Sequence, residues 1–194
     1  MQFLANLDGQ RCMNDFPVKI DFSGALQTLV VEDKPRGFRS YFYPANQPPP
    51  TGLGRMEGFF NIWQERVTDN NIPNWKDFSF ENFKGWHSNM RLIECGEIHD
   101  RADKVLIVGE TFVRYWGREC LSEEIRSGKV ISQSIISLFQ KYVEYIYNHN
   151  YAISVGELPL DGISLQPILF VDLPLSDNSS DVSHVISAII PLEK

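Results

Sequence analysis

The sequence predicts an α+β fold: a five-stranded antiparallel sheet with helices packed on one face, preceded by an N-terminal extension. Of the 194 residues, 43% are apolar and 22% are charged, which is the balance of a chain that buries a hydrophobic core. From residue 90 onward, the periodic segments follow the order strand, strand, helices, strand, strand, strand. No internal repeat is present, so solenoids and propellers are excluded.

The N-terminal part is predicted to lie outside this fold. Residues 18–22 alternate between apolar and polar and residues 29–31 are apolar, so a small hairpin is expected there. Residues 34–55 are rich in proline and glycine, which interrupt regular structure. We therefore expect residues 1–55 to form an extension that ends in a Pro-rich linker, and residues 56–194 to form the domain.

Two helical segments are expected at the start of the domain. Residues 56–68 place apolar side chains at helical spacings, namely Phe59, Phe60, Ile62, Trp63 and Val67. A second, short helix is expected to begin near Asp77 or Ser79, because either side chain can accept bonds from the free N–H groups of a first turn. Phe83 and Trp86 are expected to face inward.

Two strands and more helices follow. Residues 90–98 alternate, and residues 105–108 form an apolar run, so we expect an antiparallel hairpin whose second strand is buried. Residues 110–126 are predicted to form short helices around Gly117. The clearest helical stripe lies in residues 131–148, where apolar residues recur three and four positions apart.

Three further strands are predicted to complete the sheet. They cover residues 151–155, 165–173 and 182–192, and each is an alternating or continuous apolar run. Polar residues at 176–181 separate the last two strands.

This element order, together with three segments, resembles the PAS fold of small stand-alone alphaproteobacterial PAS proteins. Residues 105–119 (VLIVGETFVRYWGRE) resemble the family's strand–Gly–helix–Gly signature. Trp63 followed by residues 71–78 (NIPNWKDF) resembles its entry segment, and residues 171–176 (VDLPLS) resemble the end of its fourth strand. The resemblance covers residues 56–194 and implies a PAS-like fold in a sensory or interaction module.

The chain departs from the family pattern at two places. Trp75 stands where an arginine is usual, and Leu121-Ser122-Glu123 replaces a Leu-Thr-Gly type of step. These departures concern the details of a pocket more than the fold, and a fold does not by itself fix a ligand.

The charge and the cysteine content limit which partners and which cellular compartment are expected. The net charge is −7, and residues 56–194 carry 12 basic and 20 acidic residues, a net charge of −8. Such a surface repels phosphate backbones, so nucleic acid is not an expected partner. Membrane insertion is not expected either, because no uncharged apolar stretch approaches the roughly 18 residues that a membrane helix needs. Three widely spaced cysteines and the lack of a signal peptide predict reduced thiols and a cytoplasmic protein.

The residues that carry chemistry form no enzyme or metal motif. The four histidines have no partner within a helical turn, and no nucleophile elbow or phosphate loop is present, so a non-catalytic protein is expected and no metal site is assigned. His149 invites a haem-ligand interpretation, but a histidine in a last helical turn more simply interacts with free carbonyl groups. The cofactor is left unknown, because the sequence supports neither haem nor flavin.

The aromatic residues suggest a ligand site between the helices and the sheet. A small-molecule site needs apolar walls and a few polar groups that fix orientation. The candidate ligand-binding residues are Phe112, Tyr115, Trp116, Phe139, Tyr142 and Gln166. Tyr142 and Gln166 would supply the polar groups. Alternatively, the aromatic residues fill a dry core and Gln166 points to solvent.

Two functions follow from these observations. The first is a non-catalytic PAS-type sensory or regulatory module that binds a small apolar or aromatic ligand, signals through protein contact, or does both. The second is a ligand-free adaptor that dimerises. The candidate interface residues are Phe59, Phe60, Ile62 and Trp63, because exposed apolar residues on a short helix need burial.

Overall fold

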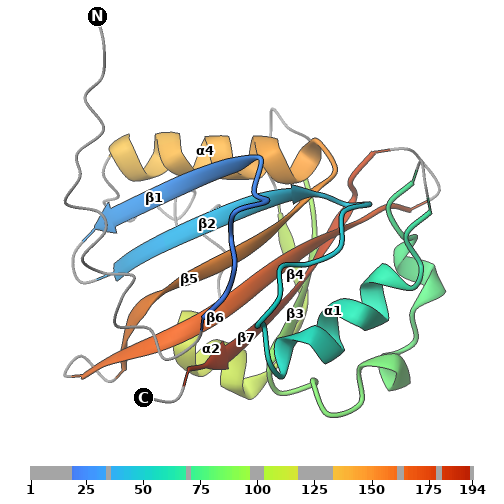
Figure 1. Cartoon of the computed structure of the whole chain (residues 1–194). Helices are drawn as coiled ribbons and strands as arrows, with labels where there is room; N and C mark the ends of the chain where they lie inside the picture. The colour runs from blue at the N-terminus through green and yellow to red at the C-terminus, as the bar shows by residue number, and fades with distance from the viewer. Residues whose placement is uncertain are drawn as a thin grey trace, which may run out of the picture.

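A computed structural model describes residues 19–33, 36–68, 71–96, 103–117, 133–160, 164–177 and 181–192. Within these ranges the strands form one seven-stranded antiparallel sheet in the order β1-β2-β5-β6-β7-β3-β4 (Figure 1). The strands are β1 (Gln27–Asp33), β2 (Arg36–Pro44), β3 (Met90–Glu94), β4 (Lys104–Val108), β5 (Asn150–Leu160), β6 (Ser164–Leu175) and β7 (His184–Pro191). The predicted α+β class is confirmed.

The sheet has seven strands instead of the expected five because the N-terminal part joins it. β1 and β2 form a hairpin, and β2 pairs with β5, so that Tyr41 lies opposite Ile153. β2 occupies residues that were predicted to be a linker. Residues 38–43 can form a continuous strand because they contain neither glycine nor proline. Gly37 and Pro44 lie only near the ends of β2. The sheet therefore crosses the domain boundary predicted at residue 55.

The helices fall close to their predicted positions. Within the described ranges the α-helices are α1 (Met56–Gln64), α2 (Glu110–Trp116) and α4 (Gln133–Tyr147). The second predicted helix is instead a pair of 3₁₀ turns, η2 (Trp75–Asp77) and η3 (Phe80–Phe83), and Asn74 caps the first by accepting a bond from the Lys76 N–H. Residues 1–18 and 118–126, and with them Cys12 and Cys120, lie outside the described residues.

Helices cover both faces of the sheet, although one face was predicted. Alternation along β6 sends Leu169 and Val171 into a core with Phe60 of α1, and sends Ile168 and Phe170 into a cluster with α2. Figure 1 shows α1 in front of the sheet and α2 behind it. α4 lies on the same side as α2, as its contact with β6 described below shows. We call this side the α2/α4 face.

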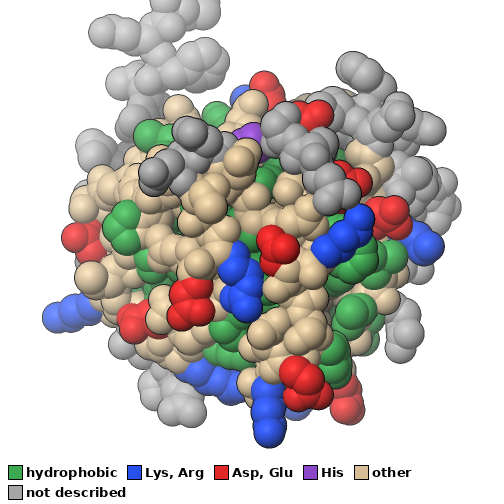
Figure 2. Space-filling view, turned by 90° about the vertical axis from the view of Figure 1, so that its right-hand side faces the viewer, with side chains coloured by type: hydrophobic (Ala, Val, Ile, Leu, Met, Phe, Trp, Pro, Cys, Tyr) green, Lys and Arg blue, Asp and Glu red, His purple; other side chains and the backbone are tan. Residues whose placement is uncertain are grey.

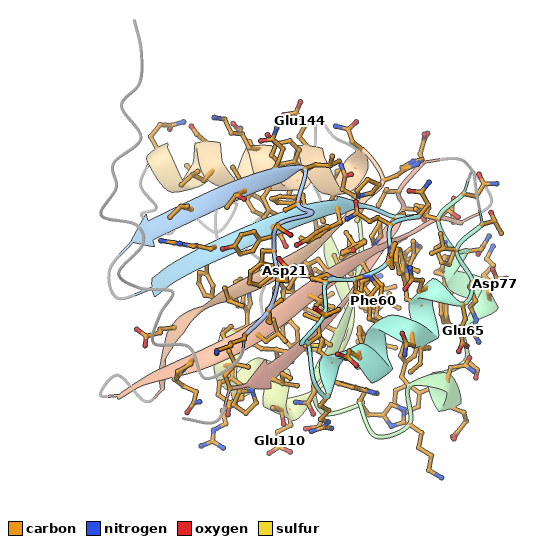
Figure 3. All side chains as sticks on the ribbon, viewed as in Figure 1. Asp21, Phe60, Glu65, Asp77, Glu110 and Glu144 are labelled. Carbon is orange, nitrogen blue, oxygen red and sulfur yellow. The ribbon has the colours of Figure 1, made fainter. Side chains whose placement is uncertain are left out.

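α1 packs its aromatic stripe into the chain's own core. Met56, Phe59, Phe60 and Trp63 follow helical spacing and are fully buried, and Phe60 lies between α1 and the sheet (Figure 3). The Trp63 indole Nε1 donates a 2.9 Å hydrogen bond to the carbonyl oxygen of Pro174. Phe59, Phe60 and Trp63 were predicted to lie at a dimer interface, but the core of the same chain already buries them. Ile62 is partly buried against the same core.

β4 is an edge strand, although its apolar run predicted a buried one. It pairs with β3 on one side, and it stands last in the sheet of the described residues. Leu106 and Ile107 are therefore 39% and 38% exposed. An apolar sequence run alone does not separate a central strand from an edge strand.

Charged side chains of both signs are mixed among the described residues on the molecular surface that Figure 2 presents. The helices of the described part of the chain are too short or too polar to cross a bilayer.

Candidate functional site

Three polar side chains lie abreast on neighbouring strands in the middle of the α2/α4 face. Asp172 of β6 is opposite Ser187 of β7, and Ser187 is opposite Arg91 of β3. Asp172 is 6% exposed, Ser187 0% and Arg91 5%. We call these three residues the polar row. Burying a carboxylate and a guanidinium among apolar strands is costly unless each is compensated, so this row is the candidate site.

Helix α4 contributes a fourth polar group, which contacts the polar row. The Tyr142 hydroxyl donates a 2.5 Å hydrogen bond to Oδ2 of Asp172, and the Ser187 hydroxyl donates to Oδ1. Each carboxylate oxygen thus accepts one hydroxyl proton. The helical stripe explains the placement, because Ile146, one turn after Tyr142, is buried while Glu144 points away from the sheet (Figure 3).

The buried environment sets the protonation of this pair. Burial raises the pKa of the Asp172 carboxyl, while the charge of Arg91 and the two hydroxyl hydrogen bonds oppose that rise. Burial and the nearby Asp172 carboxylate raise the pKa of Tyr142 well above its ordinary value. Tyr142 therefore keeps its proton at neutral pH and acts as a hydrogen-bond donor.

Two serines extend the polar contacts toward β2. Ser40 of β2 lies opposite Ser154 of β5, and their hydroxyl oxygens are 2.8 Å apart. Ser154 also hydrogen-bonds to the Tyr142 side chain. The hydroxyls of Ser40, Ser154 and Tyr142 thus connect β2 with Asp172. Satisfied buried networks of this kind are rigid and geometrically specific.

Aromatic rings border the polar row on the α2 side. Phe38 lies over Gly156, where any side chain would overlap it, and its ring centroid is 5.2 Å from that of Trp116. Trp116 stacks on Phe170 at 4.9 Å, with the ring planes 7° apart. Phe112 packs against the same Phe170 ring at 5.9 Å.

The α2 rings reach the charged row itself. The Arg91 guanidinium carbon lies 4.6 Å from the centroid of the Phe112 ring. A guanidinium over an aromatic face is held by the ring quadrupole, and Phe112 is fully buried. Phe112 thus links α2 to Arg91 in the way that Tyr142 links α4 to Asp172.

A second aromatic group borders the row on the α4 side. The Phe42 ring meets Tyr142 edge-on at 5.2 Å and Tyr145 at 4.8 Å. Phe42 stands in the same cross-strand row as Asp172, since both are paired to Ala152. The polar row therefore lies between two aromatic groups, one attached to each helix.

A glycine fixes the start of α2. A Cβ atom on Gly109 would overlap the main-chain oxygens of His87 and Ser88. The Phe112 N–H donates to the Ser88 carbonyl at 3.0 Å, and the Thr111 N–H donates to Ser88 Oγ at 3.2 Å. This close approach holds α2 in the position that places Phe112 beside Arg91.

Most of the predicted ligand-binding residues come together on this face. Phe112, Tyr115 and Trp116 belong to the α2 cluster, and Tyr142 contacts Asp172 directly. Phe139 is a partly buried residue of α4.

Gln166 is placed away from Tyr142. Its side-chain amide donates to the main-chain carbonyls of Pro167 and Leu192 at 3.2 and 3.1 Å. It lies six residues before Asp172, about 20 Å along the strand. The polar partner of Tyr142 is therefore Asp172.

Sequence reasoning missed the charged members of the row. Asp172 interrupts the apolar run of residues 168–173, and Arg91 stands among the apolar residues of β3. A charged residue inside a buried strand was the available signal, because such residues are almost never fully buried unless paired. Only the strand order shows that the two meet across Ser187.

The arrangement suits the orientation of a bound polar group. One carboxylate, one guanidinium and several hydroxyls converge between aromatic walls, which is the composition of small-molecule sites. In the described part of the chain, no three His, Cys, Asp or Glu side chains converge as metal ligands would. His149 follows α4 with a φ of 60°, and its N–H bonds to the Ile146 carbonyl, so it forms the helix end.

Compared with known proteins, the chain matches no protein-family model, no curated protein and no solved structure.

Proposed function

We propose that this protein is a PAS-type sensory or regulatory module that holds a small aromatic or apolar ligand against the polar row and signals through protein contact. The observation that carries the proposal is the part-buried Tyr142–Asp172 hydrogen bond, set between two aromatic groups. Such a site combines apolar walls with a few polar groups that orient a ligand.

The arrangement of the sheet supports the PAS part of the proposal. β3 and β4 precede α2 and α4, and β5, β6 and β7 follow these two helices, in the order expected from the resemblance. These five strands are consecutive neighbours in the sheet, in the order β5-β6-β7-β3-β4. The β1–β2 hairpin extends the same sheet beyond β5.

α4 is the element through which such a module would signal. Its inner side carries Tyr142 to the polar row, while Gln140, Lys141 and Glu144 are exposed on its outer side. A ligand that changes the Tyr142 contact changes the position or stability of α4. A partner protein that contacts the outer side of α4 would detect that change.

The adaptor alternative has weaker support. Three of its four candidate interface residues, Phe59, Phe60 and Trp63, are core residues of the same chain. Sedimentation at increasing concentration tests what is left of it, since self-association without any bound compound would favour the adaptor.

Native mass spectrometry tests the sensory proposal. The full chain is purified from the organism that makes it and compared with its Asp172→Asn and Tyr147→Phe variants. We expect a co-purifying compound on the wild type and on Tyr147→Phe, and less of it on Asp172→Asn. A compound retained equally by all three proteins would place binding elsewhere, and the bare chain mass in every sample would contradict ligand binding.

A further inference from the structure

The group that already occupies Asp172 indicates the chemistry of the ligand. A phenol, the side chain of Tyr142, lies with its hydroxyl 2.5 Å from Asp172 Oδ2. Phe42 meets this ring edge-on at 5.2 Å, and the Ser154 side chain hydrogen-bonds to its oxygen. The folded chain thus surrounds one hydroxyl-bearing aromatic ring with matching aromatic and polar contacts.

Other ligand classes fit these contacts less well. An anion would approach the Asp172 carboxylate, and a cation would approach the Arg91 guanidinium, whose charge acts on the same carboxylate. An unsubstituted aromatic ring that displaced Tyr142 would bring no hydroxyl in its place. Oδ2 of Asp172 would then lose its hydrogen bond while staying buried. A neutral ring with a hydroxyl donor satisfies both the carboxylate and the aromatic wall.

We propose that the ligand of this site is a phenol that replaces the Tyr142 side chain on Asp172 and so releases α4 from the sheet. This inference rests on the sensory function proposed above. It adds the chemical class of the ligand and the contact that the ligand breaks.

The internal phenol makes Tyr142 a competitor of the ligand. Because Tyr142 is attached to the same chain, it is present at high effective concentration and lowers the apparent affinity for a free phenol. Weakening the Tyr142 contact should therefore raise that affinity. Removing the hydrogen bond that Tyr142 donates to the Asp172 carboxylate should raise the affinity for a free phenol about tenfold or more.

The test compares p-cresol with toluene, which differ only by the hydroxyl, by calorimetric titration of four full-length proteins. These are the wild type, Tyr142→Phe, Tyr142→Ala and Tyr147→Phe. Tyr147 is the matched control, because its hydroxyl donates a 2.9 Å hydrogen bond from α4 to the Gly96 carbonyl, away from Asp172. Tyr147→Phe thus weakens α4 without emptying the site.

We expect p-cresol to bind Tyr142→Phe about tenfold more tightly than the wild type, and Tyr142→Ala at least as tightly. Tyr147→Phe should keep the wild-type affinity, and toluene should bind each protein about tenfold more weakly. Hydrogen exchange of the wild type should show faster exchange in α4 when p-cresol is bound. Tyr142→Phe keeps the ring in place, so the comparison stands even if Tyr142→Ala does not fold.

Two negative outcomes separate the two proposals. If toluene binds as tightly as p-cresol, or if Tyr142→Phe gains nothing over Tyr147→Phe, the phenol proposal is overturned while an aromatic ligand site is retained. If neither compound binds any of the four proteins, the sensory function proposed for this face fails as well.

Discussion

The Tyr142 hydroxyl donates a 2.5 Å hydrogen bond to Oδ2 of Asp172 and thereby ties α4 to β6, the middle strand of the seven-stranded sheet. On the other side of the polar row, Arg91 lies over the ring of Phe112 and contacts α2 in a parallel way. α2 and α4 are thus attached to one pair of buried charges.

Replacing Tyr142 by phenylalanine should destabilise the fold. The change removes one donor from a buried carboxylate, so we expect the free energy of unfolding to fall by about 1–3 kcal/mol. Urea unfolding measures it. Tyr147→Phe, whose hydroxyl bonds to a neutral carbonyl, should cost about 0.5–1.5 kcal/mol. Equal stability of Tyr142→Phe and the wild type would show that the bond to Asp172 contributes nothing.

Gly109 should tolerate no side chain. An alanine Cβ there would overlap the main-chain oxygens of His87 and Ser88, so we expect Gly109→Ala to lower the free energy of unfolding by about 1–3 kcal/mol. Gly58 in α1 is the control, because its added Cβ would lie 3.9 Å from Trp86, an ordinary contact. Gly58→Ala should stabilise the protein by about 0.5–1 kcal/mol. If the two variants unfold at the same temperature, the tight approach at α2 is not real.

His184 should make stability depend on pH. It is 6% exposed, its ring centroid lies 5.0 Å from that of Trp75, and burial lowers its pKa below 6.5 despite the opposing charges of Glu94 and Asp177. Below about pH 6.5 the imidazole of His184 binds a proton more readily in the unfolded chain than in the folded chain. The contribution of neutral His184 to the free energy of unfolding is therefore complete above that pH and is lost as the pH falls.

His184→Phe keeps a ring beside Trp75 and removes the titration. The stability advantage of the wild type over this variant should therefore shrink between pH 8 and pH 5 in urea unfolding. A constant difference over that range would contradict the burial effect at His184.

His149 should be replaceable with a gain in stability. Its φ of 60° lies in the left-handed region, which strains side chains other than glycine by about 1–2 kcal/mol. Part of that gain is offset by the larger freedom of glycine in the unfolded chain, so His149→Gly should stabilise the protein by about 0.5–1 kcal/mol. His149→Ala retains a Cβ and should bring no such gain. Thermal unfolding of the two variants decides the point.

The individual helices and strands with strong local patterns could be predicted from the sequence. α4 and β7 were predictable because their apolar periodicity is strong, and α1 was predictable from its aromatic stripe at helical spacing. The pairing of β2 with β5 was not, because Tyr41 and Ile153 are far apart in the chain and no local pattern records their contact. The same reason explains the misassigned linker.

The candidate site was half predictable. Tyr142 and Phe112 were selected because aromatic residues on a helical stripe face a sheet, and both lie at the polar row. Arg91 and Asp172 were not selected, because their meeting depends on β7 lying between β3 and β6. Gln166 was selected as the polar group of its strand, yet Asp172 on the same strand is the residue that contacts α4.

The most direct test of the central claim is a methyl NMR titration of the full chain with a set of small aromatic compounds. Ile168 and Ile189 report on the α2/α4 face, and Leu169 and Val171, on the neighbouring strand positions, report on the α1 side. We predict that binding compounds shift the methyl signals of Ile168 and Ile189 and leave those of Leu169 and Val171 nearly unchanged. Shifts confined to the α1 side, or no shifts with any compound, would contradict a ligand site at the polar row.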